Sequence, residues 1–346
     1  MSYQWLMDPK DLFEERYPQM LTLGLPVADV DAVRGAVAEM WPDQPGGWVH
    51  EWSALASRYA AGGRHDLAVL AYGWAKFPVL ADSAKRTALT RQTEQYRLAA
   101  PGFPVPFERR VLEVPYRGGT TPVPVHLLGA PGGPVLIASG GVDTWKMDLH
   151  PLLVELVLRT GVRVMAFDHA GTGESAVPMT ADGGIEIVRG LIAEARAIGD
   201  GRVGHFGFSM GGYYAAHSGL AGEVDAAVVL GGPVRFGFAE ENAGRLTFGM
   251  ADIFGNALGL DRRPTTAELG RAMADFPLTA LLEPEANAPM LVVNGADDIH
   301  VPQQDTLLFT GRRDTEVRLV PDTGHVAASK LPEVMPVITE WLGKHL

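Results

Sequence analysis

The residues around Ser209 have the types and spacing of a serine nucleophile. The motif G-F-S-M-G, centred on Ser209, stands between a strand predicted over Val203–Phe208 and a helix predicted over 211–218. A strand that turns directly into a helix forces the residue at the turn into a strained backbone conformation, and small neighbours two positions away let the turn close. Both of those neighbours are glycines, so the motif predicts that Ser209 is a nucleophile.

An acid is expected later in the chain, because a serine hydroxyl is inert at neutral pH unless an oriented base takes its proton. After such a turn the chain order is serine, acid and then histidine. Asp297 and Asp298 follow a strand predicted over Met290–Val293. The pattern G-x-x-D-x-x-V-P favours Asp298, because it places that carboxylate on the outer side of the turn. The alternative is that either aspartate only caps the next helix.

The base is expected beyond the last strand, predicted over 317–320. His325 follows that strand in a glycine-containing loop, from which its ring can reach Ser209. Asp298 would then hold the Nδ1–H group and stabilise the imidazolium that forms when the serine attacks.

An oxyanion needs two preorganised N–H donors. The backbone N–H of Met210, directly after the nucleophile, is expected to be one of them. The other is assigned to the backbone N–H of Val142, because the loop S-G-G-V-D at 139–143 follows a strand predicted over Val135–Ala138. The paired glycines let this backbone fold against the oxygen. His169, in the glycine-rich loop after a strand predicted over Val162–Phe167, is a further candidate for the substrate pocket.

Short apolar strands alternate with helices from Pro134 onward, and these elements must position the residues above. Their Val, Leu and Ala runs are typical of strands buried on both faces of a mostly parallel sheet. The sequence therefore predicts an α/β fold with a doubly wound sheet. Two further strands, 107–114 and 123–128, precede this region, whereas the segment 233–283 is too long for a crossover and is expected to form helices above the sheet.

The first hundred residues have a different character. They contain five of the seven tryptophans, and apolar residues recur at helical spacing through Val30–Trp41, Trp48–Tyr59 and Leu67–Phe77, with a longer helix over 82–98 and an extended linker over 101–106. We expect a helical cap segment over 1–103, a core over 104–232 and 284–346, and a second cap segment over 233–283. The aromatic residues form either a helix–helix core or the walls of a substrate pocket.

Composition excludes several classes of function. The 346 residues are 47% hydrophobic and carry a net charge of −12, so a nucleic-acid or anionic-membrane partner is not expected. There is no cysteine and no closely spaced histidine pair, so we expect no metal site and no cofactor. The N-terminus lacks the features of a signal peptide and no apolar run is long enough to span a membrane, so a cytoplasmic, soluble protein is expected.

The chain resembles the α/β-hydrolase superfamily over about 135–346. The stretch from Asp168 to Ser175 matches the pattern D-x-x-G-x-G-x-S common in that superfamily. The 139–143 loop and the N-terminal helices resemble a narrower group, which includes the fermentation–respiration switch proteins, the dihydroxypseudooxynicotine hydrolases and fungal polyketide-shortening hydrolases. This resemblance implies a helical cap, carbon–carbon bond hydrolysis of ketones by some members, and homodimers. It also implies an acidic cap residue, for which Glu240 and Glu241 are candidates; the alternative is that they form a solvated helix turn.

The leading hypothesis is a serine hydrolase that acts on the carbonyl carbon of a bulky aromatic or polyketide-like ester or ketone. The triad alone leaves ester, thioester and carbon–carbon bond cleavage open. An acyltransferase or cyclase of secondary metabolism could use the same three residues. A binding protein without catalysis is the third hypothesis, although such a protein has no need to keep all three.

Overall fold

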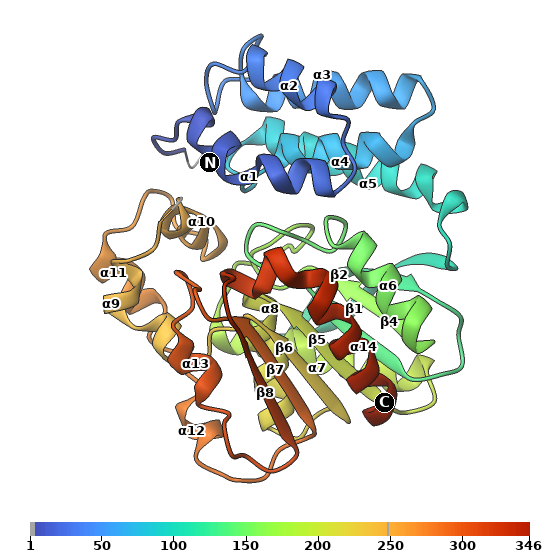
Figure 1. The fold of residues 1–346 in the computed structure, drawn as a ribbon, viewed down its shortest axis with the longest axis vertical. Helices are drawn as coiled ribbons and strands as arrows, with labels where there is room; N and C mark the ends of the chain where they lie inside the picture. Colours follow the sequence, from blue (N-terminus) through green and yellow to red (C-terminus); the bar gives the residue numbers. More distant parts are fainter. Residues whose placement is uncertain (1–3, 248) are drawn as a thin grey trace. The chain divides into compact units, whose positions relative to one another are not determined.

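The computed structural model describes residues 4–247 and 249–346 and divides into two compact units. One unit comprises residues 1–104 together with 248–256 and 260–263. The other comprises 105–247, 257–259 and 264–346. The first is helical and the second contains the sheet (Figure 1).

The second unit is built on an eight-stranded sheet in the order β1-β2-β4-β3-β5-β6-β7-β8. β1 pairs antiparallel with β2, and β2 pairs antiparallel with β4, while all other neighbours are parallel. The α/β fold class is confirmed, because the inner strands β3, β4 and β6 are buried at every residue, as a sheet covered on both faces requires. The strands are β1 Phe107–Tyr116, β2 Gly119–Leu128, β3 Val135–Ser139, β4 Arg163–Phe167, β5 Val203–Phe208, β6 Ala226–Leu230, β7 Met290–Gly295 and β8 Thr315–Val320.

Helices cover both faces of this sheet (Figure 1). They are α6 His150–Thr160, α7 Ala181–Ile198, α8 Met210–Leu220, α13 Gln303–Leu307 and α14 Leu331–His345, with a 3-10 segment η3 at His325–Lys330. The sequence reasoning does not predict α14, which contains two prolines. Pro332 occupies its first turn, where no backbone N–H is needed, and Pro336 lies inside the helix. Val334, Ile338 and Trp341 form its buried side.

The helical unit has a core of aromatic side chains. Trp48 and Trp52 are fully buried, and the rings of Phe13 and Trp74 pack against them. These side chains therefore form a helix–helix core, which is one of the two interpretations left open by the sequence. The helices of its N-terminal part are α1 Pro9–Thr22, α2 Val27–Ala36, α3 Trp48–Ala61, α4 His65–Lys76 and α5 Ser83–Ala99, followed by η1 Ala100–Gly102.

Two predictions about the helical unit are wrong in detail. The helical pattern through Val30–Trp41 predicts a longer helix, but α2 ends at Ala36, and Val37 has the extended conformation. The backbone from Ala38 to Trp48 instead forms a loop, which is closed by hydrogen bonds such as that from Trp48 N–H to the carbonyl of Glu39. The predicted linker also begins with the short η1 turn rather than with extended chain.

The segment between β6 and β7 forms short helices, as predicted. They are η2 Phe236–Phe238, α9 Glu240–Ala243, α10 Met250–Ala257, α11 Thr266–Ala272 and α12 Thr279–Leu282. The buried carboxylate of Asp305 in α13 accepts the backbone N–H groups of Arg235, Phe236 and Gly237, and thereby fixes the start of the segment. Within residues 4–247 and 249–346, no helix combines the length and apolar character that crossing a bilayer requires.

Candidate active site

Ser209 lies at a sharp turn between β5 and α8. Its backbone has φ 55° and ψ −121°, a strained conformation for a residue other than glycine. The neighbouring glycines are required sterically. A Cβ atom on Gly207 would lie 2.1 Å from the carbonyl oxygen of Gly211, and one on Gly212 would lie 2.6 Å from the Cα atom of Gly232. The turn therefore has the geometry that the motif predicts.

The structure brings Ser209, His325 and Asp298 together. Nε2 of His325 lies 2.7 Å from Oγ of Ser209, and Nδ1 lies 2.7 Å from Oδ2 of Asp298. A carboxylate accepts hydrogen bonds, so Nδ1 carries the proton and Nε2 is left as the acceptor for the serine hydroxyl. Asp297, the alternative acid, is exposed at the surface of the turn. The arrangement is that of a nucleophile, a base and an orienting acid.

The Asp298 side chain is fully buried and satisfied by hydrogen bonds. Its Oδ1 atom accepts the backbone N–H groups of His300 at 2.8 Å and Val301 at 3.1 Å. Its Oδ2 atom accepts from His325 and, at 2.8 Å, from the side-chain amide of Asn294. Burial raises the pKa of Asp298, but the hydrogen bonds and the facing histidine outweigh it, so the pKa lies below its usual value. The carboxylate is therefore charged at neutral pH.

Asn294, which contacts Asp298, is not among the residues that the sequence predicts at this site. It is fully buried at the end of β7, and its Oδ1 atom accepts the backbone N–H of Gly295 at 2.9 Å and that of Val326 at 3.0 Å. Val326 and Ala327 both have positive φ, at 54° and 51°, so the loop after His325 is held in an uncommon conformation. One side chain thus joins the acid to the loop that carries the histidine. A polar residue within a buried strand was the available signal.

The loop after β3 approaches the serine at a glycine. A Cβ atom on Gly141 would lie 3.0 Å from Cβ and 3.2 Å from Oγ of Ser209. In the described part of the chain, the backbone N–H groups of Val142 and Met210 have no hydrogen-bond acceptor. An oxyanion hole requires two unpaired donors of this kind beside the nucleophile. The assignment of these two donors stays a prediction.

The three other predicted pocket residues make no hydrogen bond to the Ser209–His325–Asp298 group in the described structure. His169 is buried, with its ring 5.3 Å from that of Tyr214, and burial lowers its pKa. Glu240 and Glu241 are exposed in the first turn of α9. Among the residues that the structure describes, no group of three histidine, aspartate or glutamate side chains could hold a metal ion.

The fold and this turn define an α/β-hydrolase. The family model described as "Esterase FrsA-like" matches residues 38–346, so the chain belongs to the FrsA-like esterase family and is a hydrolase. The narrower resemblance inferred from the sequence is thereby confirmed.

Solved structures of similar fold cover both units. AbyA5 is 22% identical with a TM-score of 0.79, and the match covers 92% of this chain and 90% of that one. The 2,6-dihydroxy-pseudo-oxynicotine hydrolase is 22% identical with a TM-score of 0.73, over 94% and 95%. At this level of identity the likeness concerns the fold.

Similarity to a curated protein is more limited. Hydrolase LUC6 from Fusarium sp. is 24% identical over an alignment of 240 residues, and the match covers 57% of this chain. The chain spans 57% of the length of that relative.

Proposed function

We propose that this FrsA-like hydrolase uses Ser209 as a covalent nucleophile, His325 as general base and acid, and Asp298 as the orienting carboxylate. The observation that carries the proposal is the pair of 2.7 Å contacts that join the three side chains in series. A binding protein without catalysis needs neither contact. The fully buried, hydrogen-bonded Asp298 supports the same conclusion, since a charged carboxylate behind the ring stabilises the imidazolium.

The proposed reaction passes through an acyl-enzyme. Oγ of Ser209 attacks the carbonyl carbon of the substrate while its proton passes to Nε2 of His325. The carbonyl oxygen becomes an oxyanion, which accepts hydrogen bonds from the N–H groups of Val142 and Met210. The tetrahedral intermediate collapses, the leaving group departs with the proton from His325, and water then attacks the acyl carbon with the same histidine as base.

We propose a bulky aromatic or polyketide-like ester or ketone as the substrate class. Two observations support this class: the family is one of esterases, and a structural neighbour hydrolyses 2,6-dihydroxy-pseudo-oxynicotine. In the ester case the leaving group is an alkoxide. In the ketone case it is a carbanion, which an adjacent carbonyl group or aromatic ring must stabilise. The proposed assembly is a homodimer whose helical segments act as a cap, with a small molecule as its partner.

Labelling with a fluorophosphonate tests the proposed nucleophile directly. Wild type is expected to gain one phosphonyl group, which peptide mass spectrometry places on Ser209. Ser209→Ala should not be labelled, whereas Ser83→Ala, which removes an exposed serine at the start of α5, should be labelled like wild type. Equal labelling of Ser209→Ala and wild type would refute the assignment.

A further inference from the structure

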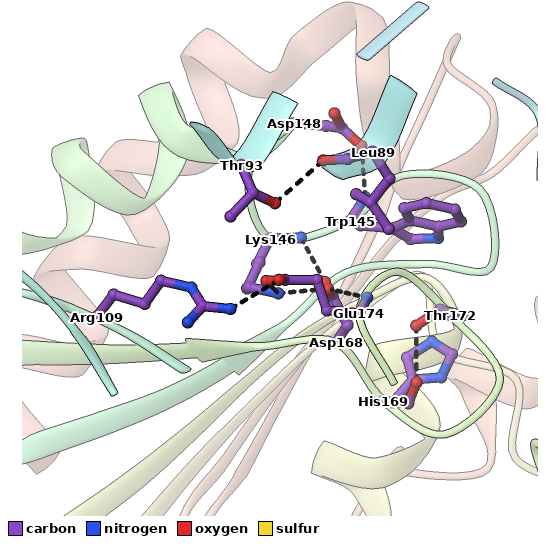
Figure 2. A network of polar contacts seen from close by, with 10 residues as sticks. All are labelled: Leu89, Thr93, Arg109, Trp145, Lys146, Asp148, Asp168, His169, Thr172 and Glu174. Atoms are coloured by element: carbon purple, nitrogen blue, oxygen red, sulfur yellow. Dashed lines mark hydrogen bonds and ion pairs between the residues drawn. The ribbon is translucent and has the colours of Figure 1, made fainter. Parts of the chain in front are cut away.

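Four charged side chains lie close together in the sheet-containing unit: Arg109, Lys146, Asp168 and Glu174 (Figure 2). Nζ of Lys146 lies 2.5 Å from Oδ2 of Asp168 and 2.8 Å from Oε2 of Glu174. Nη2 of Arg109 in β1 donates to the other oxygen of Glu174 at 2.8 Å. The Lys146 side chain is 0% exposed and that of Asp168 is 2% exposed. Two positive and two negative charges balance one another in this buried cluster.

The cluster fixes main chain as well as side chains. Oδ1 of Asp168 accepts the backbone N–H of Lys146 at 2.9 Å, and Oδ2 accepts the backbone N–H of Glu174 at 2.9 Å. The glycine at 173 permits this approach, because a Cβ atom there would lie 2.1 Å from Oδ2 of Asp168. Burial lowers the pKa of Lys146, but Asp168 and Glu174 outweigh it, so the pKa is raised and the lysine stays charged. In some proteins, a buried ion pair does little to stabilise the fold but helps to define a single geometry.

Lys146 is connected to Val142 through Trp145. The indole Nε1–H of Trp145 donates to the carbonyl oxygen of Val142 at 3.1 Å, and the Trp145 side chain is buried. The backbone N–H of Trp145 donates to Asp148 at 2.9 Å (Figure 2). On the other side of Val142, the Gly141 N–H donates to the carbonyl of Thr144 at 2.9 Å. Thr144 and Trp145 therefore hold the peptide unit that follows Val142 and the one that precedes Gly141, so the Val142 N–H lies between two fixed peptide units.

We propose that Trp145 and Lys146 are positioning residues, which aim the backbone N–H of Val142 at the oxyanion formed during catalysis. The inference rests on the proposed function, since it concerns one donor of the proposed oxyanion hole. Neither residue is assigned a contact with the reacting atoms. Both act through the loop: Lys146 anchors it to Asp168, and Trp145 fixes the carbonyl of Val142. A donor displaced by about 1 Å loses most of its effect on the transition state.

Trp145→Phe provides the sharpest test, because it removes the indole N–H and keeps an aromatic ring in the buried site. With a 4-nitrophenyl ester as the probe, kcat is expected to fall roughly 10–100-fold while KM changes by no more than about twofold. An alkyl trifluoromethyl ketone gives an independent readout. Ser209 adds to its carbonyl carbon, the serine proton passes to His325, and the carbonyl oxygen becomes a hemiketal oxyanion. The affinity of Trp145→Phe for this ketone should fall by the same factor as its kcat.

Lys146→Met should give the same pattern with a lower melting temperature, because it leaves two carboxylates facing one arginine. Leu191→Ala is the matched control. It removes a fully buried side chain in α7 and should lower the melting temperature without changing kcat or the affinity for the ketone. A loss of kcat in Leu191→Ala equal to that in Lys146→Met would assign the effect to stability and overturn the proposal.

Folded Trp145→Phe with wild-type kcat and wild-type affinity for the ketone would also overturn the positioning role. Ser209→Ala separates this result from a failure of the proposed function. If Ser209→Ala is inactive and Trp145→Phe is fully active, the nucleophile assignment stands and the positioning role is wrong. If Ser209→Ala is fully active, the proposed function itself is wrong, and the positioning role fails with it.

Discussion

The side-chain amide of Asn294 donates a 2.8 Å hydrogen bond to Oδ2 of Asp298, the oxygen that also accepts from His325. The other end of the same amide accepts the backbone N–H of Val326, the residue directly after His325. From the end of a buried strand, Asn294 thereby bridges Asp298 and the loop that carries His325.

Asn294→Ala should therefore lower kcat as well as stability. The substitution leaves the Val326 N–H without its acceptor and frees the histidine loop, so we expect kcat to fall roughly 10–1000-fold. Steady-state kinetics with a 4-nitrophenyl ester and thermal unfolding measure the two effects. Asn287→Ala is the control: Asn287 holds Arg313 and Thr315 just before the same strand, so its loss should affect stability alone. Unchanged kcat in Asn294→Ala would contradict the role of Asn294.

Asp298→Asn should lower kcat by roughly 10⁴-fold, because the amide no longer stabilises the imidazolium and favours the wrong tautomer of His325. Asp297→Asn should retain activity within about twofold. Asp297 lies in the same turn, but its side chain is exposed, and substitutions at exposed positions usually have small effects. Kinetics of the two variants side by side test the assignment. A larger loss in Asp297→Asn would reverse it.

Gly141→Ala tests how closely the loop approaches the nucleophile. The added methyl group would lie 3.0–3.2 Å from the Ser209 side chain, so the loop or the serine must shift. We expect kcat to fall roughly 10–100-fold, with little change in melting temperature. Gly133→Ala is the control, because no atom lies within 4 Å of a Cβ atom at that position. Equal activity of the two variants would show that the contact at Gly141 does not matter for catalysis.

Lys85 should make the stability of the helical unit depend on pH. Its side chain is fully buried, and burial lowers its pKa to about 7. The unfolded lysine, with an ordinary pKa of about 10.4, binds more protons than the folded one between those two values, so stability rises with pH in that window. Between about pH 7 and about pH 9.5, the free energy of unfolding of wild type should rise by roughly 1–3 kcal/mol relative to that of Lys85→Met. Chemical unfolding monitored by tryptophan fluorescence measures this difference. A constant difference, or one of opposite sign, would contradict the prediction.

The sequence predicts those parts of the fold and site that local patterns determine. Buried strands such as Ala226–Leu230 have continuous apolar runs, and the strand, turn and helix around Ser209 follow from its glycines. The contact between Asp298 and His325 can be predicted from the sequence. Each residue follows a strand, and the acid precedes the histidine in the chain order expected after such a turn. The position of Asp298 within its turn needed only the local pattern.

The sequence does not predict the contacts of Lys146 and Asn294, because their partners lie far away in the chain. Lys146 is 22 positions from Asp168, and Asn294 is 32 positions from Val326. Nothing in the spacing of a lone lysine or asparagine reveals such a partner. The end of α2 at Ala36 was also missed, because long-range contacts and loop closure override helical periodicity there. Local sequence thus predicts the contacts among Ser209, Asp298 and His325 better than the residues that hold them in place.

Rapid mixing with a 4-nitrophenyl ester is the decisive measurement of whether Ser209 forms an acyl-enzyme. Wild type is expected to release a burst of about one 4-nitrophenolate per active site, and intact-mass spectrometry of the quenched reaction should show the acyl group on Ser209. Ser209→Ala should show neither the burst nor the added mass. A full burst and an acyl adduct in Ser209→Ala, or rapid turnover of that variant, would show that Ser209 is not the nucleophile.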